Sequence, residues 1–353
     1  MNLFGLNIDP VLVDLVVIII KSVVLIVALL TIFAYVQLVE RRVIARIQVR
    51  IGPNRTGPFG LLQPVADAIK AIFKEEVVPA GADRLLFIIA PGLSVVTALI
   101  AFAVIPLGPP IDINGYKLTL YIADVNIAVL YVLAIGSLSV YGIVLAGWSS
   151  NNKYALLGAL RSAAQLVSYE ISLGLALVGV LMLSGSLSLT QIINYQDGTW
   201  LGVIPRWNIF IQPIGFIIYF IGAMAETNRL PFDLPEAETE LIAGYHIEYS
   251  SIKFAFFFMA EYINIITVSA IAATLFLGGY LAPFGILPGP WWLVIKIALL
   301  IFVFMWIRGT FPRLRYDQLM NLGWKVMLPL ALLNILITAG EILIPSLTTV
   351  ASR

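Results

Sequence analysis

The chain has 353 residues, of which 60% are apolar and 12% are charged; its net charge is +1 and it contains no cysteine. The small net charge gives no bulk attraction to nucleic acid. The absence of cysteine excludes a disulfide framework, a thiolate-held iron–sulfur cluster and thiol chemistry in this chain. The length would allow two soluble domains, but the mean hydropathy of +0.98 indicates an integral membrane protein instead.

Apolar runs of about 18 residues or more recur along the chain, and such runs can cross a hydrocarbon core about 30 Å thick. Lipid offers the backbone no hydrogen-bond partner, so these runs have to be helical. We therefore predict an all-α, polytopic membrane protein that forms a single integral-membrane domain over 1–353, with about eight transmembrane helices. The predicted spans are 11–39, 85–106, 125–148, 155–184, 205–226, 249–278, 292–307 and 323–345, the seventh of which is short.

The first apolar run is expected to remain as a helix in the mature protein. It is too long for the hydrophobic region of a cleavable signal peptide. It also ends in Glu40, Arg41 and Arg42, without a small-residue cleavage site.

Residues 40–84 are predicted to form a cytoplasmic loop that contains one interfacial amphipathic helix. The stretch 52–58 is rich in turn-forming Gly, Pro and Asn. Over 61–73, apolar residues recur at helical spacing while Asp67 and Lys70 lie elsewhere on the helix. The apolar positions are Leu62, Val65, Ala66, Ile69, Ile72 and Phe73.

The basic residues predict the orientation in the membrane. Sixteen of the 21 Lys and Arg residues lie in segments 40–84, 149–161, 226–253 and 308–325. The positive-inside rule places these segments in the cytoplasm and, for an even number of spans, both termini outside.

Segment 226–250 is predicted to be an acidic cytoplasmic loop, because Pro231 and Pro235 break any continuous helix. Seven of the 20 acidic residues lie between positions 226 and 261, and within this stretch only Arg229 and Lys253 oppose them. A solvated loop is the simpler interpretation, but carboxylates near a membrane are costly, and clustered carboxylates raise one another's proton affinity. The seven are Glu226, Asp233, Glu236, Glu238, Glu240, Glu248 and Glu261.

The only histidine, His246, lies in the same segment. A single histidine is more often structural than functional. Without a second His or any Cys, no metal site is expected.

Glu170 is predicted to lie deep in the membrane. It follows Arg161 by nine residues, which is about 13–14 Å along a helix. An ionisable residue at this depth is a candidate for a proton route. The alternative is a structural carboxyl that is hydrogen-bonded to a neighbouring Ser or Tyr.

Four arginines follow the first span at steps of four or five: Arg41, Arg42, Arg46 and Arg50. One stripe of a helical extension can hold three of them. They are either an anchor on lipid phosphates or part of a functional site.

Several motifs together resemble one family, the H subunit of bacterial proton-pumping NADH:quinone oxidoreductase, which corresponds to subunit 1 of respiratory complex I. The resemblance covers about residues 35–325. The motifs are Glu-Arg-Arg (40–42), Gln-Val-Arg-Ile-Gly-Pro-Asn-Arg (48–55), Gly-Pro-Phe-Gly-Leu-Leu-Gln-Pro (57–64), Ala-Asp-Ala-Ile-Lys (66–70), Ser-Asn-Asn-Lys-Tyr (150–154), Leu-Arg-Ser-Ala-Ala-Gln (160–165), Ser-Tyr-Glu (168–170), Pro-Phe-Asp-Leu-Pro-Glu-Ala-Glu (231–238) and Gly-Tyr-His-Ile-Glu-Tyr-Ser (244–250).

The resemblance implies roles for the candidate residues. A proton route would use Glu170 and Glu261, with Ser137 in the third helix, where some relatives carry a further glutamate and this chain has Gly136 and Ser137. No residue is assigned a catalytic role. The residues implied for the quinone cavity and its coupling are Arg41, Arg42, Arg46, Arg50, Asp67, Glu226, Arg229, Asp233, Glu236, Glu238, Glu240, His246 and Glu248.

The resemblance also implies the surroundings of the chain, which would be a multi-pass protein of the cytoplasmic (inner) membrane. It would bind no cofactor itself, take quinone as substrate, and leave FMN and iron–sulfur clusters to partner subunits. Those partners would be the soluble quinone-site and iron–sulfur subunits of the peripheral arm, and the small and antiporter-like membrane subunits. Two alternatives remain: a related subunit of a membrane-bound hydrogenase or dehydrogenase, and a free-standing cation transporter.

Overall fold

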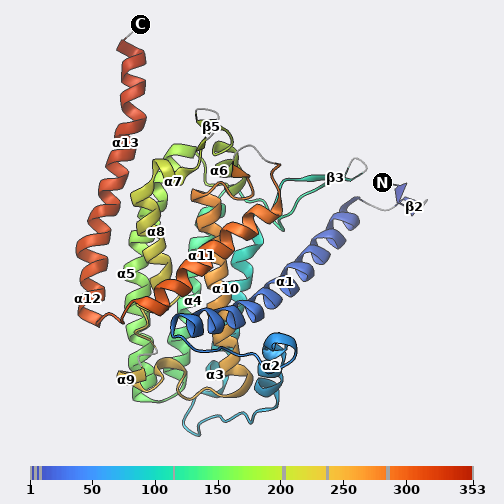
Figure 1. The fold of residues 1–353 in the computed structure, drawn as a ribbon, viewed down its shortest axis with the longest axis vertical. Helices are drawn as coiled ribbons and strands as arrows, with labels where there is room; N and C mark the ends of the chain where they lie inside the picture. The colour runs from blue at the N-terminus through green and yellow to red at the C-terminus, as the bar shows by residue number, and fades with distance from the viewer. Residues whose placement is uncertain are drawn as a thin grey trace.

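A computed structural model describes residues 2–3, 6–7, 10–113, 116–200, 204–235, 238–283 and 287–351. Within these ranges the chain is a bundle of long helices whose strands are short (Figure 1). The α-helices are α1 Pro10–Ile47, α2 Gln63–Phe73, α3 Arg84–Ala101, α4 Ala128–Ser149, α5 Lys153–Ser184, α6 Leu189–Tyr195, α7 Asn208–Ile211, α8 Pro213–Glu226, α9 Glu238–Leu241, α10 Ser251–Phe276, α11 Pro290–Thr310, α12 Tyr316–Asn321 and α13 Leu328–Ala351.

Shorter elements join these helices. Three antiparallel two-stranded pairs are present: β1 with β2, β3 with β4, and β5 with β6. Their bounds are Asn2–Leu3, Leu6–Asn7, Ile111–Ile113, Tyr116–Leu118, Thr199–Trp200 and Ile204–Pro205. Among the described residues, three 3-10 turns lie at Pro58–Gly60, Phe102–Val104 and Gly244–His246, and a π-helical segment, Leu322–Met327, connects α12 to α13.

The all-α membrane prediction is confirmed. In the described ranges seven helices are long and apolar enough to cross a membrane. The fifth predicted span, 205–226, is shorter than expected: α8 has 14 residues and begins at Pro213, after the one-turn helix α7. The seventh span, which looked short in the sequence, is a helix of 21 residues.

The helix ends follow local sequence signals. The Asn152 side chain accepts a hydrogen bond from the Tyr154 N–H at 2.9 Å and so begins α5, and Asp83 caps α3 in the same way. At its other end α5 stops at Gly185, whose φ of 64° is typical of a glycine C-cap. The first helix runs on to Ile47, eight residues past the predicted end at 39, and therefore carries the first three arginines of the basic group.

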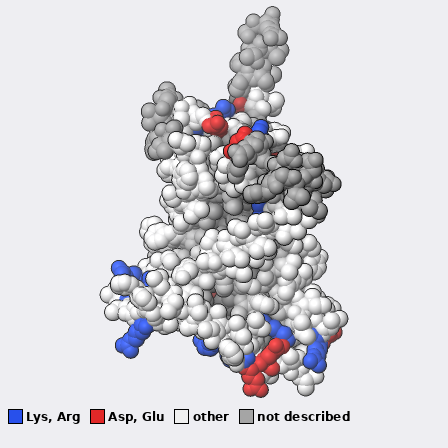
Figure 2. All heavy atoms as spheres, turned by 90° about the vertical axis from the view of Figure 1, so that its right-hand side faces the viewer, with Lys and Arg blue, Asp and Glu red and all other residues white. Residues whose placement is uncertain are grey.

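The long helices contact one another in a continuous series: α3 with α4, α4 with α5, α5 with α8 and α13, and α10 with α3 and α11. The main core joins α5, α8, α10 and α11 through Tyr169, Tyr219, Phe276 and Phe304. The start of α1 and the end of α13 lie toward the same end of the bundle, whereas α2 and α9 lie at the other (Figure 1). Figure 2 shows most charged side chains of one face at these two ends, with a wide uncharged belt between them.

The predicted interfacial helix is present as α2. Its apolar side chains face away from the rest of the chain, so that Val65, Ile69 and Ile72 remain more than half exposed. An amphipathic helix with an uncovered apolar face fits the predicted position at a membrane surface.

Candidate functional site

The deepest part of the site joins three helices through two carboxylates. Glu170 on α5 accepts a hydrogen bond from the Ser137 hydroxyl on α4. Glu226, the last residue of α8, approaches the neighbouring Gly136 so closely that a Cβ there would lie 2.8 Å from its Oε1. The glycine therefore leaves room for the carboxylate, and Glu170 and Glu226 are near enough to interact electrostatically.

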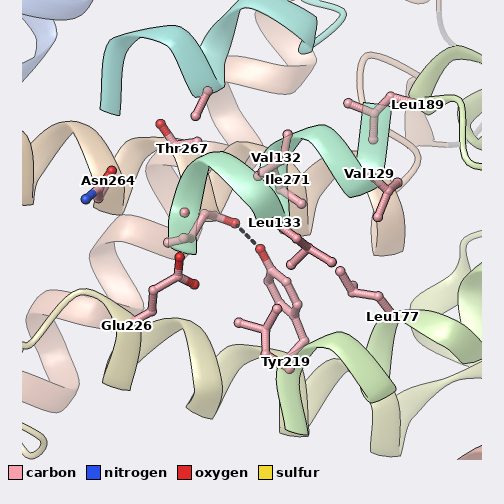
Figure 3. Close-up of a pocket in the computed structure, with 14 residues that line it drawn as sticks. Val129, Val132, Leu133, Leu177, Leu189, Tyr219, Glu226, Asn264, Thr267 and Ile271 are labelled. Atoms are coloured by element: carbon pink, nitrogen blue, oxygen red, sulfur yellow. Dashed lines mark hydrogen bonds between the residues drawn. The ribbon is translucent and has the colours of Figure 1, made fainter. Parts of the chain in front are cut away.

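Two small cavities meet at Glu226. The first, of about 40 Å³, is also lined by Tyr219 and by Asn264 and Thr267 of α10. Figure 3 shows Glu226, Asn264 and Thr267 at one end of this cavity and Leu133, Leu177 and Leu189 at the other, while the Tyr219 hydroxyl donates to the Val268 carbonyl at 3.0 Å. One end of this cavity is therefore apolar, and the other offers hydrogen-bond donors and acceptors.

The second cavity, of about 30 Å³, shares Glu226 and Asn264 with the first and adds Glu261, Asn228, Ser94 and Ser139. A water molecule needs about 10–15 Å³ of cavity volume and two to four polar partners. Each cavity therefore has the size and polarity for a small water cluster. Glu226 and Asn264 stand between them.

A buried charge cluster lies beside the second cavity. Arg229 Nη1 is 2.9 Å from Glu40 Oε1, and its Nε contacts Glu261. The guanidinium also lies over the Tyr262 ring, 4.4 Å from the ring centroid. Arg229 and Glu40 are only 6% and 4% exposed, and breaking such a buried pair typically costs about 3–5 kcal/mol.

Glu40 and Arg308 belong to this cluster but were missed by the sequence reasoning. Arg308 Nη1 contacts the same Glu40 oxygen as Arg229. In the sequence both residues stand at the ends of apolar runs, where a charge is expected to face the membrane surface. Their position gave one usable signal, since a carboxylate directly after a span and beside two arginines is a candidate ion pair.

The acidic loop does not form one carboxylate cluster. Asp233 pairs with Arg313 at 3.2 Å, Glu240 with Arg161 at 2.6 Å, and Glu248 accepts from the Asn152 side-chain amide at 2.7 Å. The expectation that little basic charge opposes this loop is therefore wrong. Arg161 and Arg313 come from other loops, which the sequence does not place next to it.

Two of the predicted residues are not placed. Glu236 lies outside the described residues. Glu238 begins the one-turn helix α9, but its side chain is also outside the described part.

The four arginines of the basic group lie in two environments. Arg41 Nη1 is 2.7 Å from Asp67 Oδ2 and so links α1 to α2. Arg42 donates to the Phe59 carbonyl. With Arg46 and Arg50 it lines an open pocket of about 570 Å³. Arg50 lies beyond the end of α1 and donates to Gln48 Oε1 at 2.7 Å.

His246 lies in an aromatic environment rather than in a ligand set. Its ring meets Tyr245 and Phe254 edge to face, and it is buried. Burial lowers the pKa of His246 to about 4, so the imidazole is neutral at neutral pH. Among the described residues no group of three or more His, Cys, Asp or Glu is arranged to hold a metal ion.

Comparison with known proteins decides the family. The family model described as NADH dehydrogenase matches residues 20–339. The chain belongs to this family. The matched NADH dehydrogenase region contains every residue of the site described above, from Glu40 to Arg313.

Curated relatives within the NADH dehydrogenase family are close in sequence and in length. The chain is 58% identical to the H subunit of NADH-quinone oxidoreductase from Thermomicrobium roseum, over 88% of this chain and 91% of the relative. It is 54% identical to the second of the H subunits of NADH-quinone oxidoreductase from Geobacter metallireducens, over 91% and 94%. It is 50% identical to the H subunit from Rickettsia bellii, over 93% and 94%. The resemblance identified from the motifs is confirmed, and neither a hydrogenase component nor a free-standing transporter is favoured.

Proposed function

We propose that this chain is the membrane subunit of a proton-translocating NADH:quinone oxidoreductase, in which it forms the quinone-access cavity and couples quinone reduction to proton movement. The relatives' names support the first part. One observation carries the second: Glu226 borders both internal cavities, between the Ser137–Glu170 pair and the cluster of Arg229 with Glu40 and Glu261. These ionisable and polar groups would together form the proton route through the helix bundle.

The quinone would enter between α1, α2 and α10. The contacts between these elements support this placement. Arg41 joins α1 to Asp67 of α2, the Ser251 hydroxyl of α10 donates to the Ala71 carbonyl of α2 at 2.9 Å, and Lys253 contacts Glu76. Arg42, Arg46 and Arg50 would face the soluble arm, whose electrostatic attraction they would strengthen.

Coupling would be electrostatic. Two-electron reduction adds two negative charges to the quinone, and these draw two protons from nearby acids. A carboxylate that gains or loses a proton changes the net charge around Arg229 and so the strength of its two ion pairs, because that guanidinium is shared between Glu40 and Glu261. The altered net charge would favour proton exchange at Glu226 across the two cavities and then at Glu170.

The surroundings follow from the same proposal. The protein would lie in the cytoplasmic membrane with both termini outside. It has no cysteine to ligate a cluster. FMN and iron–sulfur clusters would therefore be held by soluble partner subunits, and the long outer helices would contact small and antiporter-like membrane subunits.

The test is a pair of Glu170 variants in the assembled complex. Glu170→Gln keeps the volume and can still accept from Ser137, but it removes the titrating group. We expect slower quinone reduction and weaker acidification in reconstituted vesicles, whereas Glu170→Asp retains part of both. If Glu170→Gln pumps at the wild-type rate, Glu170 is a structural carboxyl that Ser137 satisfies, and the proton route is wrong at this residue.

A further inference from the structure

A buried amide on α5 holds the turn that carries the charge cluster. The Nε2 atom of Gln165 donates to the carbonyls of Ala225 and Phe232, both at 2.8 Å, and lies 3.3 Å from Asn228 Oδ1. The side chain is fully buried. Its acceptors lie along a single turn, residues 225–232, which leaves the end of α8.

The chemistry of these groups explains the contact. Because α8 ends at Glu226, the Ala225 carbonyl lacks the partner that a longer helix would supply four residues on. It accepts instead from the Asn228 N–H at 3.2 Å, and Gln165 adds a second donor. A buried carbonyl without a donor is costly, and an amide NH₂ has two hydrogens for two carbonyls. The opposite amide orientation would place Oε1 against three acceptors, so the donor side of Gln165 has to face the turn.

The clamped turn contains both functional parts of the site. Glu226 follows Ala225 directly and borders the two cavities. Arg229 lies between Ala225 and Phe232 in the sequence, and the Arg229 carbonyl accepts a hydrogen bond from the Phe232 N–H at 2.7 Å. The position of the turn therefore sets where the Arg229 guanidinium meets Glu40 and Glu261.

We propose that Gln165 is a positioning residue for the coupling reaction: its amide fixes the turn 225–232 against α5 and so fixes Glu226 relative to Arg229. This inference rests on the proposed function for its effect on quinone reduction, but not for its effect on the position of the turn. Loss of the donors lets the turn separate from α5. Glu226 and Arg229 then lose their shared geometry although both side chains are still present.

The functional test uses Gln165→Leu and Gln165→Glu in the assembled complex. Gln165→Leu has no donor, and we expect it to lower quinone reduction per assembled complex by about tenfold at every pH, which is about 1.4 kcal/mol. In Gln165→Glu, the protonated carboxyl still donates one hydrogen bond, whereas the carboxylate donates none and repels both carbonyls. Its activity relative to wild type should therefore rise as the pH falls from 8 to 6, a profile that simple loss of packing would not produce.

Gln196→Leu is the matched control. Gln196 is an equally buried amide whose Nε2 donates to the Thr274 carbonyl at 2.9 Å, near the C-terminal end of α10 and away from the charge cluster. This variant removes the same kind of hydrogen bond, and we expect normal quinone reduction per assembled complex. An equal loss in Gln196→Leu and Gln165→Leu would show general destabilisation and overturn the positioning role.

A second measurement reports the turn itself, whether or not the chain takes part in quinone reduction. The chain has no cysteine, and Thr227 is only 2% exposed. A Thr227→Cys substitution should therefore react slowly with a water-soluble maleimide in the intact complex. Adding Gln165→Leu should speed labelling of this chain by about tenfold, which corresponds to about 1.4 kcal/mol in favour of the open turn. Adding Gln196→Leu should not change it.

The two measurements distinguish the effect of Gln165 on the position of the turn from its effect on quinone reduction. Equally slow labelling in the Gln165→Leu and Gln196→Leu backgrounds would overturn the positioning role. Faster labelling in Gln165→Leu with unchanged quinone reduction would show that the amide holds the turn. It would also show that the geometry of Glu226 and Arg229 is not used, which would contradict the proposed function instead.

Discussion

Two of the buried cations lie beside different parts of α10 and are satisfied in different ways: Arg229 lies near the middle of this helix and Lys296 near its C-terminal end. Arg229 meets carboxylates, those of Glu40 and Glu261. Lys296 on α11 meets backbone carbonyls: its Nζ donates to Leu277, Gly279 and Leu281 at 2.6–2.8 Å. It also lies 4.3 Å from the centroid of the Trp207 ring.

The local sequence accounts for the Lys296 site. α10 ends at Phe276, where the helix dipole is negative and its last carbonyls lack partners. Gly278 and Gly279 then take φ values of 73° and 54°, which allow the chain to curl so that three carbonyls converge on the ammonium. A Cβ at Gly278 would also lie only 2.7 Å from Trp207 Nε1.

The difference shows which buried charge can respond to redox chemistry. Carboxylates take up and release protons, so the interactions of Arg229 change with the charge state of its partners, and a cavity lies beside them. Backbone carbonyls neither take up nor release protons, so the three partners of Lys296 keep the same charge. We therefore infer that the Arg229 cluster serves coupling, whereas the Lys296 site stabilises the fold.

Removing the Arg229 cation should have the largest effect on both stability and quinone reduction. Arg229→Met leaves Glu261 without its guanidinium partner, and we expect the free energy of unfolding to fall by about 3–5 kcal/mol. Quinone reduction per assembled complex should fall by about a hundredfold. Arg229→Lys should recover only part of this, because a single ammonium cannot reproduce the forked contact with two carboxylates. More than half of the wild-type rate in Arg229→Met would contradict a role in coupling.

Removing the Lys296 cation should lower stability without lowering quinone reduction. Lys296→Met deletes three charge-assisted hydrogen bonds and leaves their carbonyls unsatisfied, so we expect stability to fall by about 3 kcal/mol. Thermal unfolding of the detergent-solubilised complex would measure this loss. Quinone reduction per assembled complex should match wild type. If Lys296→Met keeps its stability but reduces quinone slowly, Lys296 serves the reaction and not the fold, which contradicts this assignment.

The pH dependence of stability should reveal His246. Its pKa is about 4 in the folded chain and 6.5 without burial, so the unfolded chain takes up this proton first as the pH falls. The stabilisation is therefore complete above pH 6.5 and is lost as the pH falls toward 4, by about 3 kcal/mol in total. Replacing His246 by Phe should make the unfolding midpoint less dependent on pH between 6.5 and 4. Equal slopes in variant and wild type would show that other groups dominate.

The smallest change in stability is expected at the exposed end of the acidic loop. The Arg161–Glu240 pair has side chains that are 33% and 47% exposed. Glu240→Gln should therefore alter stability by less than about 1 kcal/mol. We nevertheless expect quinone reduction to fall by about tenfold, because the proposed coupling role of the acidic loop depends on its charge. Wild-type NADH:quinone activity in Glu240→Gln would contradict a role for Glu240 and leave only the buried residues of the loop as candidates.

The amino-acid sequence determined the class of the protein, most of its helices and its family. Hydropathy is a property of consecutive residues, and lipid permits only helices for such runs, so pattern alone was sufficient. The motifs also indicated the acidic segment and gave Ser137 and Glu170 as candidates for a proton route. Helical periodicity predicted the amphipathic helix α2. The predicted break of 226–250 followed from its prolines, since proline acts on its own backbone.

Only the tertiary structure decided which charges meet. Arg229 and Glu40 are 189 residues apart, and no local pattern specifies that α1 brings its last carboxylate under the turn after α8. The two cavities, the contact of Gly136 with Glu226 and the clamp by Gln165 depend likewise on how α4, α5, α8 and α10 pack together. Burial converts these side chains from ordinary polar residues into a coupled set, because an unpaired charge or amide is tolerable in water and costly inside the bundle.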